Sequence, residues 1–157
     1  MEFDHTFSIS APIGAVWTTI TDIERVAPCV PNTRIVGPAR PGAGRDSFDV
    51  EITAAVGPFE ITAEGRITLA ERDDAAHREV LEIVANDADG DKLAEATVTI
   101  VLTQDGETTG GAVHSSVELG GIGALVAKET LDQVAGNTLR KFAANLEALL
   151  REAPDPG

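Results

Sequence analysis

Apolar and polar residues alternate along much of this chain, and this pattern predicts a sheet of antiparallel strands. Residues 2–9 place four side chains on one face: Phe3, His5, Phe7 and Ile9. The same period of two indicates strands at 34–36, 46–54, 59–69, 78–86, 92–103 and 109–119. Gly57-Pro58 and Asp105-Gly106 separate neighbouring runs and favour hairpins.

Helical spacing of apolar residues interrupts this pattern near the start of the chain and replaces it at the end. Val16, Trp17 and Ile20 predict a first helix, and a second short turn is expected over residues 23–27. A long helix is expected over residues 121–152. Its second half has an apolar face of Leu131, Ala135, Leu139, Phe142, Leu146 and Leu149. Its first half offers only small residues: Gly121, Gly123, Ala124 and Ala127.

The order of these elements predicts an α+β domain of the helix-grip type. A curved antiparallel sheet of six to seven strands would wrap around the long C-terminal helix, with two short helices after the first strand. We expect one domain over residues 1–153 and a short tail over 154–157. The inward strand positions include many small residues, which favours an internal cavity over close packing: Ala54, Ala63, Gly65, Ala85, Ala94, Ala96 and Ser115.

The net charge of the chain restricts the classes of partner that it can bind. A formal net charge of −14 over 157 residues argues against nucleic acids and against anionic membrane surfaces. No apolar run approaches the roughly 20 residues of a membrane span. A single cysteine, Cys29, excludes an internal disulfide, so a cytoplasmic location is expected.

The histidines do not form an obvious catalytic group. His5 lies on an apolar strand face, and the sequence shows no carboxylate partner for it, so a buried polar group is a better interpretation than a general base. His77 and His114 are expected to face solvent. We therefore predict no catalytic residue.

Two other motifs suggest chemistry and have simpler explanations. Cys29 lies in a loop without basic neighbours, which favours a packing role at the cavity rim over a reactive thiolate. Asp87, Asp89 and Asp91 resemble a calcium loop, but Gly90 and Val98 stand at the wrong positions for one, and a polar turn is the better interpretation. We expect no metal site and no cofactor, because the sequence holds no metal-spaced cluster or phosphate-binding loop.

Several motifs, in their order along the chain, resemble one family. They are Trp17 with Thr21-Asp22, the loop Ala27-Pro-Cys-Val-Pro31, the hairpin Val56-Gly-Pro-Phe59, the strand from Glu64 to Glu71, and Gly121, Ala124, Ala135 and Phe142 of the last helix. Together they are similar to the CoxG family of carbon monoxide dehydrogenase, within the START-like (SRPBCC, Bet v 1-like) superfamily. One departure is Asn32, where that family usually has glycine after Cys-x-Pro.

The resemblance implies an apolar pocket for a quinone- or lipid-like molecule, in an accessory protein of a carbon monoxide dehydrogenase-type molybdenum hydroxylase. The protein would be a monomer or homodimer. We expect Cys29 and Pro31 at the rim. The side chains expected to line the cavity are Trp17, Val30, Phe48, Val50, Ile52, Phe59, Ile61, Ala124, Ala127, Leu131 and Phe142.

Two other functions remain open at the level of sequence. The superfamily also contains enzymes of the polyketide cyclase and dehydratase kind, and an acid–base pair lining the cavity would favour that alternative. A protein-interaction module with a collapsed interior is the third. Ligand binding is preferred because the predicted interior is mostly small aliphatic residues with scattered hydroxyl groups.

Overall fold

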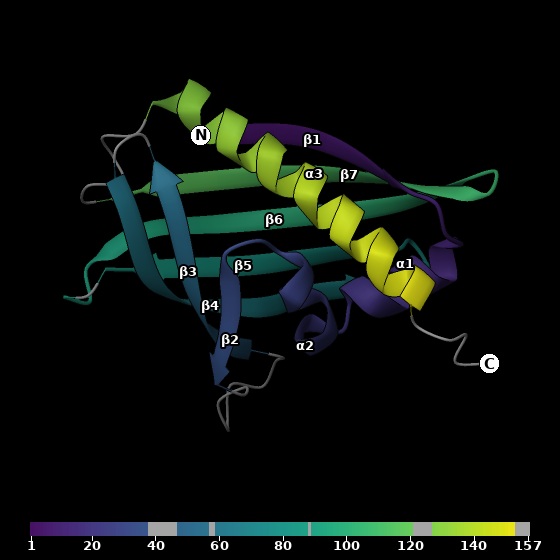
Figure 1. Cartoon of the computed structure of the whole chain (residues 1–157), viewed down its shortest axis with the longest axis horizontal. Coiled ribbons are helices and arrows are strands. Elements are labelled where there is room, and N and C mark those ends of the chain that lie inside the picture. The colour runs from purple at the N-terminus through teal and green to yellow at the C-terminus, as the bar shows by residue number, and fades with distance from the viewer. Residues whose placement is uncertain (38–46, 57–58, 88, 121–126, 153–157) are drawn as a thin grey trace.

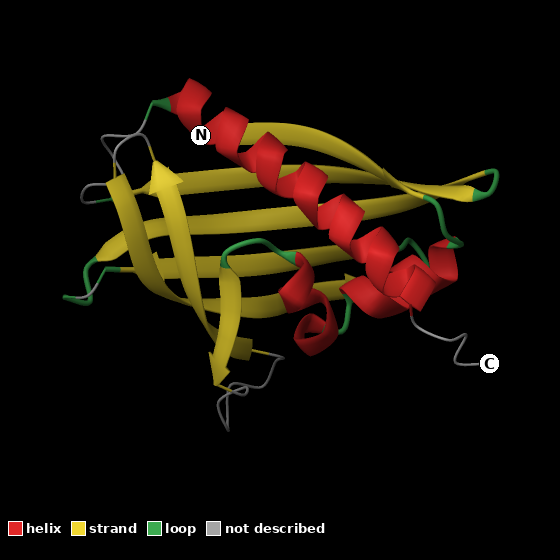
Figure 2. Ribbon diagram, viewed as in Figure 1, coloured by secondary structure: helices red, strands yellow, loops and turns green. Residues whose placement is uncertain are grey.

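A single curled sheet and one long helix make up most of the molecule (Figures 1 and 2). The computed structural model describes residues 1–37, 47–56, 59–87, 89–120 and 127–152. Within these ranges, seven strands pair in the order β1-β7-β6-β5-β4-β3-β2. Every neighbouring pair is antiparallel, so the predicted helix-grip fold is confirmed.

The strands agree closely with the ranges that alternation predicts. Their bounds are β1 Glu2–Ile9, β2 Thr33–Gly37, β3 Ser47–Val56, β4 Phe59–Asp73, β5 Arg78–Asn86, β6 Lys92–Asp105 and β7 Thr108–Leu119. In β1 the pattern of burial follows the sequence, since Phe3, Phe7 and Ile9 are buried and the residues beside them are more exposed. Strand alternation therefore fixes which side chains face the helix.

The helices lie on the concave side of the sheet (Figure 2). They are α1 Ile13–Ile20, α2 Ile23–Val26, the 3-10 turn η1 Ala27–Cys29 and α3 Lys128–Glu152. The chain thus continues in a helical turn through Pro28, beyond the predicted end at residue 27. The long helix begins at Lys128 rather than at 121, and residues 121–126 lie outside the described residues.

The close-packed core lies where α1 and the C-terminal half of α3 meet the sheet (Figure 1). Leu146 of α3 is fully buried there, as are Ile9 of β1 and Val16 of α1. The Phe7 and Phe142 rings meet edge to face, with 6.0 Å between their centroids. The rest of this cluster is Trp17, Ile20, Val26, Cys29 and Leu102.

The helix α3 runs along β1, the edge strand of the sheet, and also packs on η1. Two polar contacts hold it there: Glu147 Oε1 accepts the Ser10 backbone N–H at 2.6 Å, and Asn145 Nδ2 donates to the Cys29 carbonyl at 2.9 Å. Among the described helices, none combines the length and apolar character needed to cross a membrane.

Candidate functional site

An apolar cavity of about 290 Å³ lies between the concave face of the sheet and α3. Its walls come from most elements of the fold. Its polar members are Thr33, Ser115, Thr138, His5 and Glu79. Its apolar walls are formed by Phe7, Ile20, Ile23, Val26, Ala27, Val30, Ile67, Leu81, Val98, Ile100, Val113, Ala135, Leu139 and Phe142.

The cavity arises because short side chains face one another across the interior. On the sheet, Val98, Val113 and Ser115 are only half-buried, although their strands lie in the middle of the fold. On the helix wall, Ala135 and Thr138 are equally short. Side chains of this length leave the space between helix and sheet unfilled, whereas native cores are normally close-packed. The structure therefore contains a cavity, but not where most of the predicted small residues lie. Ser115 belongs to its lining, whereas Ala63, Gly65, Ala85, Ala94 and Ala96 do not, and its helix wall comes from the apolar half of α3.

The carboxyl group of Glu79, on β5, is the most unusual feature of this cavity. Its side chain is buried, with a relative exposure of 1%, and neither carboxyl oxygen has a hydrogen-bond partner among the described residues. Burial raises the pKa of Glu79 from 4.5 to about 7, against a smaller lowering by the positive charge of Arg72. The carboxyl group is therefore neutral in a large share of the molecules at pH 7.

Glu79 was not identified from the sequence, because an acidic residue on a strand is normally taken to face solvent. A usable signal was present. Glu79 stands two residues before Leu81 and four before Ile83, so the period of two places it on the same inward face. In that position the apolar neighbours, rather than the charge of the residue itself, indicate the direction of the side chain.

His5 occupies the β1 side of the same cavity and has a partner that the sequence did not reveal. Its Nε2 lies 3.1 Å from Oδ1 of Asp132 on α3. The expectation that His5 lacks a carboxylate partner is therefore wrong, since packing of α3 on β1 brings together residues far apart in the chain. The imidazole also faces Gly136, where an added Cβ would lie 3.7 Å from the ring.

His5 and Glu79 stand at the two ends of one row of paired residues across the sheet. His5 pairs with Val113, Val113 with Ile100, and Ile100 with Glu79. Three strand spacings of ~4.8 Å separate their backbones by about 14 Å along the sheet. The two polar groups thus face the cavity from opposite sides, with an apolar floor of Ile100 and Val113 between them.

Of the side chains predicted to line the cavity, Val30 and Phe142 do so. Phe48 and Val50 are buried on β3, outside this lining. Ile52 and Leu131 are half-buried and also lie outside it. Ala127 is exposed and precedes α3, accepting the Leu131 N–H at 3.1 Å. Ala124 and the side chains of Phe59 and Ile61 lie outside what the structure describes.

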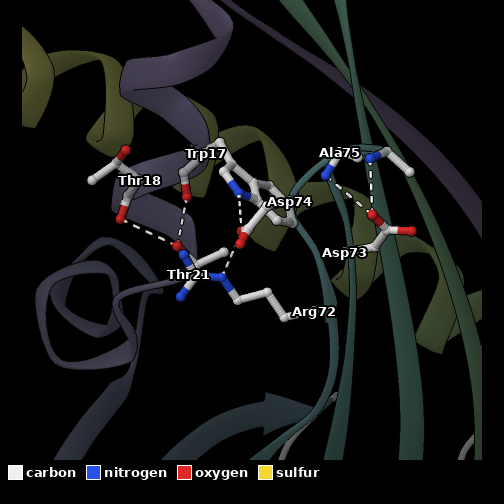
Figure 3. A network of polar contacts seen from close by, with 8 residues as sticks. Trp17, Thr18, Thr21, Arg72, Asp73, Asp74 and Ala75 are labelled. Carbon is white, nitrogen blue, oxygen red and sulfur yellow. Dashed lines mark hydrogen bonds and ion pairs between the residues drawn. The ribbon is translucent and has the colours of Figure 1, made fainter.

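Trp17, another predicted lining residue, belongs to the close-packed core. Its Nε1 donates to Asp74 Oδ1 at 2.9 Å, and Arg72 Nε donates to the same oxygen at 2.7 Å (Figure 3). These two hydrogen bonds lower the pKa of Asp74. His77 packs edge-on against the indole, with 5.5 Å between centroids, so the prediction that it faces solvent is wrong.

The two predicted rim residues, Cys29 and Pro31, stand next to Val30 of the cavity wall. Cys29 is buried, and this burial raises the pKa of its thiol, while the positive charge of Arg25 has a smaller opposing effect. Pro31 is half-buried. A thiol with a raised pKa is a weak nucleophile at neutral pH, which agrees with a packing role.

Two remaining motifs are explained by local structure. Asp87 Oδ1 accepts the backbone N–H groups of Asp89 and Asp91, each at 2.9 Å, as the predicted polar turn requires. His114 is exposed as predicted. Its ring nitrogens lie 2.8 Å from Asp4 and 3.3 Å from Glu2, and these contacts raise the pKa of His114.

A larger hollow of about 460 Å³ lies on the outer face of the sheet. Charged and polar side chains such as Glu64 and Glu82 line it together with Val36, Val50 and Val84. Arg66 forms an ion pair with Asp49 there at 3.3 Å. Its charged side chains lie at the outer surface, and Arg66 and Asp49 are paired with each other, so they do not need a ligand as a partner. The apolar cavity under α3, with its buried carboxyl group, is the better candidate for a binding site.

Solved structures with the same fold cover nearly the whole chain. A conserved protein from Geobacillus kaustophilus has a TM-score of 0.80 at 16% identity, with 97% of this chain and 96% of that chain covered. A START superfamily protein from Mycobacterium smegmatis has a TM-score of 0.59 at 18% identity, with coverage of 96% and 97%. Truncated norcoclaurine synthase from Thalictrum flavum has a TM-score of 0.63 at 12% identity, with coverage of 98% and 95%.

These identities establish a shared fold and nothing finer. Among curated proteins, none matches this sequence significantly. The model of the carbon monoxide dehydrogenase CoxG family matches residues 6–151, which is nearly the whole domain. The predicted resemblance is therefore confirmed, and the chain belongs to the CoxG family of carbon monoxide dehydrogenase.

Proposed function

We propose that this protein binds a hydrophobic small molecule in the cavity between α3 and the sheet. The observation that carries the proposal is the cavity itself, about 290 Å³ in volume and walled almost entirely by apolar side chains. Ligand sites of small molecules are typically apolar hollows with a few polar groups that fix orientation. Here those polar groups are Glu79, His5 and three hydroxyl side chains.

The finer proposal is that the ligand is quinone- or lipid-like and that the protein is an accessory to a carbon monoxide dehydrogenase-type molybdenum hydroxylase. Membership of the CoxG family supports the partner. The apolar walls support the ligand class. A cytoplasmic location belongs to the same proposal.

Native mass spectrometry of freshly purified protein tests the binding function directly. We expect a bound species whose mass is lost on denaturation. Ala135→Leu adds a branched side chain to the helix wall of the cavity and should abolish both this species and the binding of a fluorescent apolar probe. Ala144→Leu, on the exposed side of the same helix, is the matched control and should leave both unchanged.

Probe binding that survives Ala135→Leu would place the ligand elsewhere and refute the proposal. Wild-type protein that binds neither a co-purified molecule nor the probe would refute it as well. Both measurements are made on the full chain, and the melting temperature of each variant shows that it is folded.

The second candidate is an enzyme of the cyclase or dehydratase kind, favoured by the presence of Glu79 and His5 in one cavity. A carboxyl group with a pKa near 7 suits proton transfer at neutral pH. A captured ligand whose mass changes on incubation with the protein would favour catalysis over storage or transfer.

A further inference from the structure

No contact within the described residues explains why position 79 is a glutamate. Its carboxyl oxygens have no hydrogen-bond partner in the described part of the chain, and its side chain is fully enclosed. A buried polar group left without a partner destabilises the fold, whereas a leucine of similar length would contribute to packing. A polar residue that lines a cavity at such a cost to stability is a candidate for ligand recognition.

The positive charge of Arg72, which acts on Glu79, does not compensate for this burial. Arg72 pairs with Glu79 across β4 and β5, yet its Nε donates to Asp74 instead, at 2.7 Å. Trp17 donates to the same Asp74 oxygen, so this carboxylate accepts both the indole N–H and the Arg72 Nε–H (Figure 3). The Glu79 carboxyl group is therefore left facing the cavity.

We propose that Glu79, as a neutral carboxylic acid, is the polar recognition residue of the cavity and donates a hydrogen bond to a carbonyl oxygen of an otherwise apolar ligand. This inference rests on the proposed binding function and adds the residue and the chemical class. A neutral acid offers one O–H donor, so it selects an acceptor oxygen. A hydrocarbon would leave the carboxyl group unsatisfied, and rejection of ligands that lack the matching polar atom is the stronger kind of discrimination.

The position of Glu79 also orients the ligand. From Glu79 the row of paired residues continues over Ile100 and Val113 to His5, so the body of the ligand would lie on this apolar floor with its carbonyl end at β5. Among the described cavity-lining residues, His5 is the other titratable side chain, and Asp132 stands behind it. Arg72 is the cation whose charge acts on Glu79.

Two matched probes test the proposal: acetylnaphthalene, which has a carbonyl group, and ethylnaphthalene, which is close in shape and lacks it. Their dissociation constants are measured near pH 6 by displacement of a fluorescent apolar probe from the full chain. We expect wild-type protein to bind the ketone with a dissociation constant about tenfold lower, the difference that one well-made hydrogen bond produces. Glu79→Leu should remove the preference, and Glu79→Gln, whose amide still donates, should keep most of it.

Glu82→Gln on the exposed face of β5 is the control and should change neither affinity. Equal affinities of the wild type for the two probes, or a preference that survives Glu79→Leu, would overturn the role of Glu79 and leave the binding cavity standing. Tighter binding of naphthylmethylamine than of the ketone would overturn it too, because Glu79 would then act as an anion. If neither naphthalene binds, the cavity function fails and this inference fails with it.

Discussion

Leu146 and Leu81 both lie between the helix and the sheet, yet they differ in burial, although Phe7, Ile20 and Val26 belong to both the core cluster and the cavity wall. Leu146, near the end of α3, is fully buried in a cluster that includes Ile9, Val16 and Trp17. Leu81, on β5, is only half-buried and borders the cavity. The difference comes from the side chains opposite: large ones from α1 at one end, and short ones such as Ala135 at the other. One helix therefore contributes to both regions: Leu146 closes the core, and Ala135 and Thr138 leave space at the cavity.

Matched leucine truncations give the largest expected contrast between these regions. Leu146→Ala should reduce the free energy of unfolding by about 2–5 kcal/mol, because it creates a void in a close-packed cluster. Leu81→Ala enlarges a space that already exists and should cost about 1 kcal/mol, mainly the lost burial of the side chain. Urea denaturation of both variants measures the two values. Equal losses would show that the cavity end is as tightly packed as the core.

The pH dependence of stability tests the buried carboxyl group. The native state holds the proton of Glu79 more tightly than the unfolded chain, so its contribution to stability is full below pH 4.5 and is lost as the pH rises to about 7 and beyond. This shift corresponds to roughly 3 kcal/mol. Glu79→Gln should therefore gain stability relative to wild type between pH 5 and pH 8. A difference between the two proteins that does not vary with pH would mean that Glu79 is solvated in the native state.

Two alanine-to-leucine changes on α3 make the next contrast. Ala143 packs against the close-packed cluster, so Ala143→Leu should overpack it and cost about 1–3 kcal/mol. Ala135 borders the cavity, and Ala135→Leu should cost less than about 1 kcal/mol because empty space receives the added carbons. Thermal melting of the two variants in the absence of ligand provides the comparison. A larger loss of stability for Ala135→Leu than for Ala143→Leu would mean that the helix is close-packed at Ala135 and has free space at Ala143.

The smallest expected effect is a gain in stability. Gly136 lies in the middle of α3, and an added Cβ would lie 3.7 Å from the His5 ring, an ordinary contact distance. Gly136→Ala should therefore stabilise the protein by about 0.5–1 kcal/mol through its better helix propensity. A melting temperature below that of wild type would show that His5 needs the open space at this position.

The fold was predictable from the sequence because alternation and helical spacing are local signals. Strands β5, β6 and β7 fall within two residues of the predicted ranges, and the antiparallel order follows from short hairpins. The start of α3 was predicted less well. The small residues before Lys128 carry a helical pattern that does not fix where the helix begins.

The site was predicted only in outline, because it depends on which inward residues the curl of the sheet brings together. Phe48 and Val50 are buried, yet they lie on β3, beyond the lining of the cavity. Trp17 was assigned to the cavity, but its indole is held by Asp74, a contact between residues 57 positions apart. The ligand-binding role of the predicted residues stays a prediction. Glu79 is a further candidate, which the structure added because its side chain lines the cavity.

The position of α3 along β1 has a consequence for association between molecules. β1 pairs with β7 on one side and forms an edge of the sheet on the other, and unpaired edge strands are templates for edge-to-edge aggregation. Glu147 and Asp132 fasten the helix to this strand through Ser10 and His5. The opposite edge, β2, is only five residues long and its register is irregular between Ile35 and Gly37. The helix that bounds the cavity therefore also packs along β1, the longer of the two edge strands. A chain truncated before α3 should self-associate through β1.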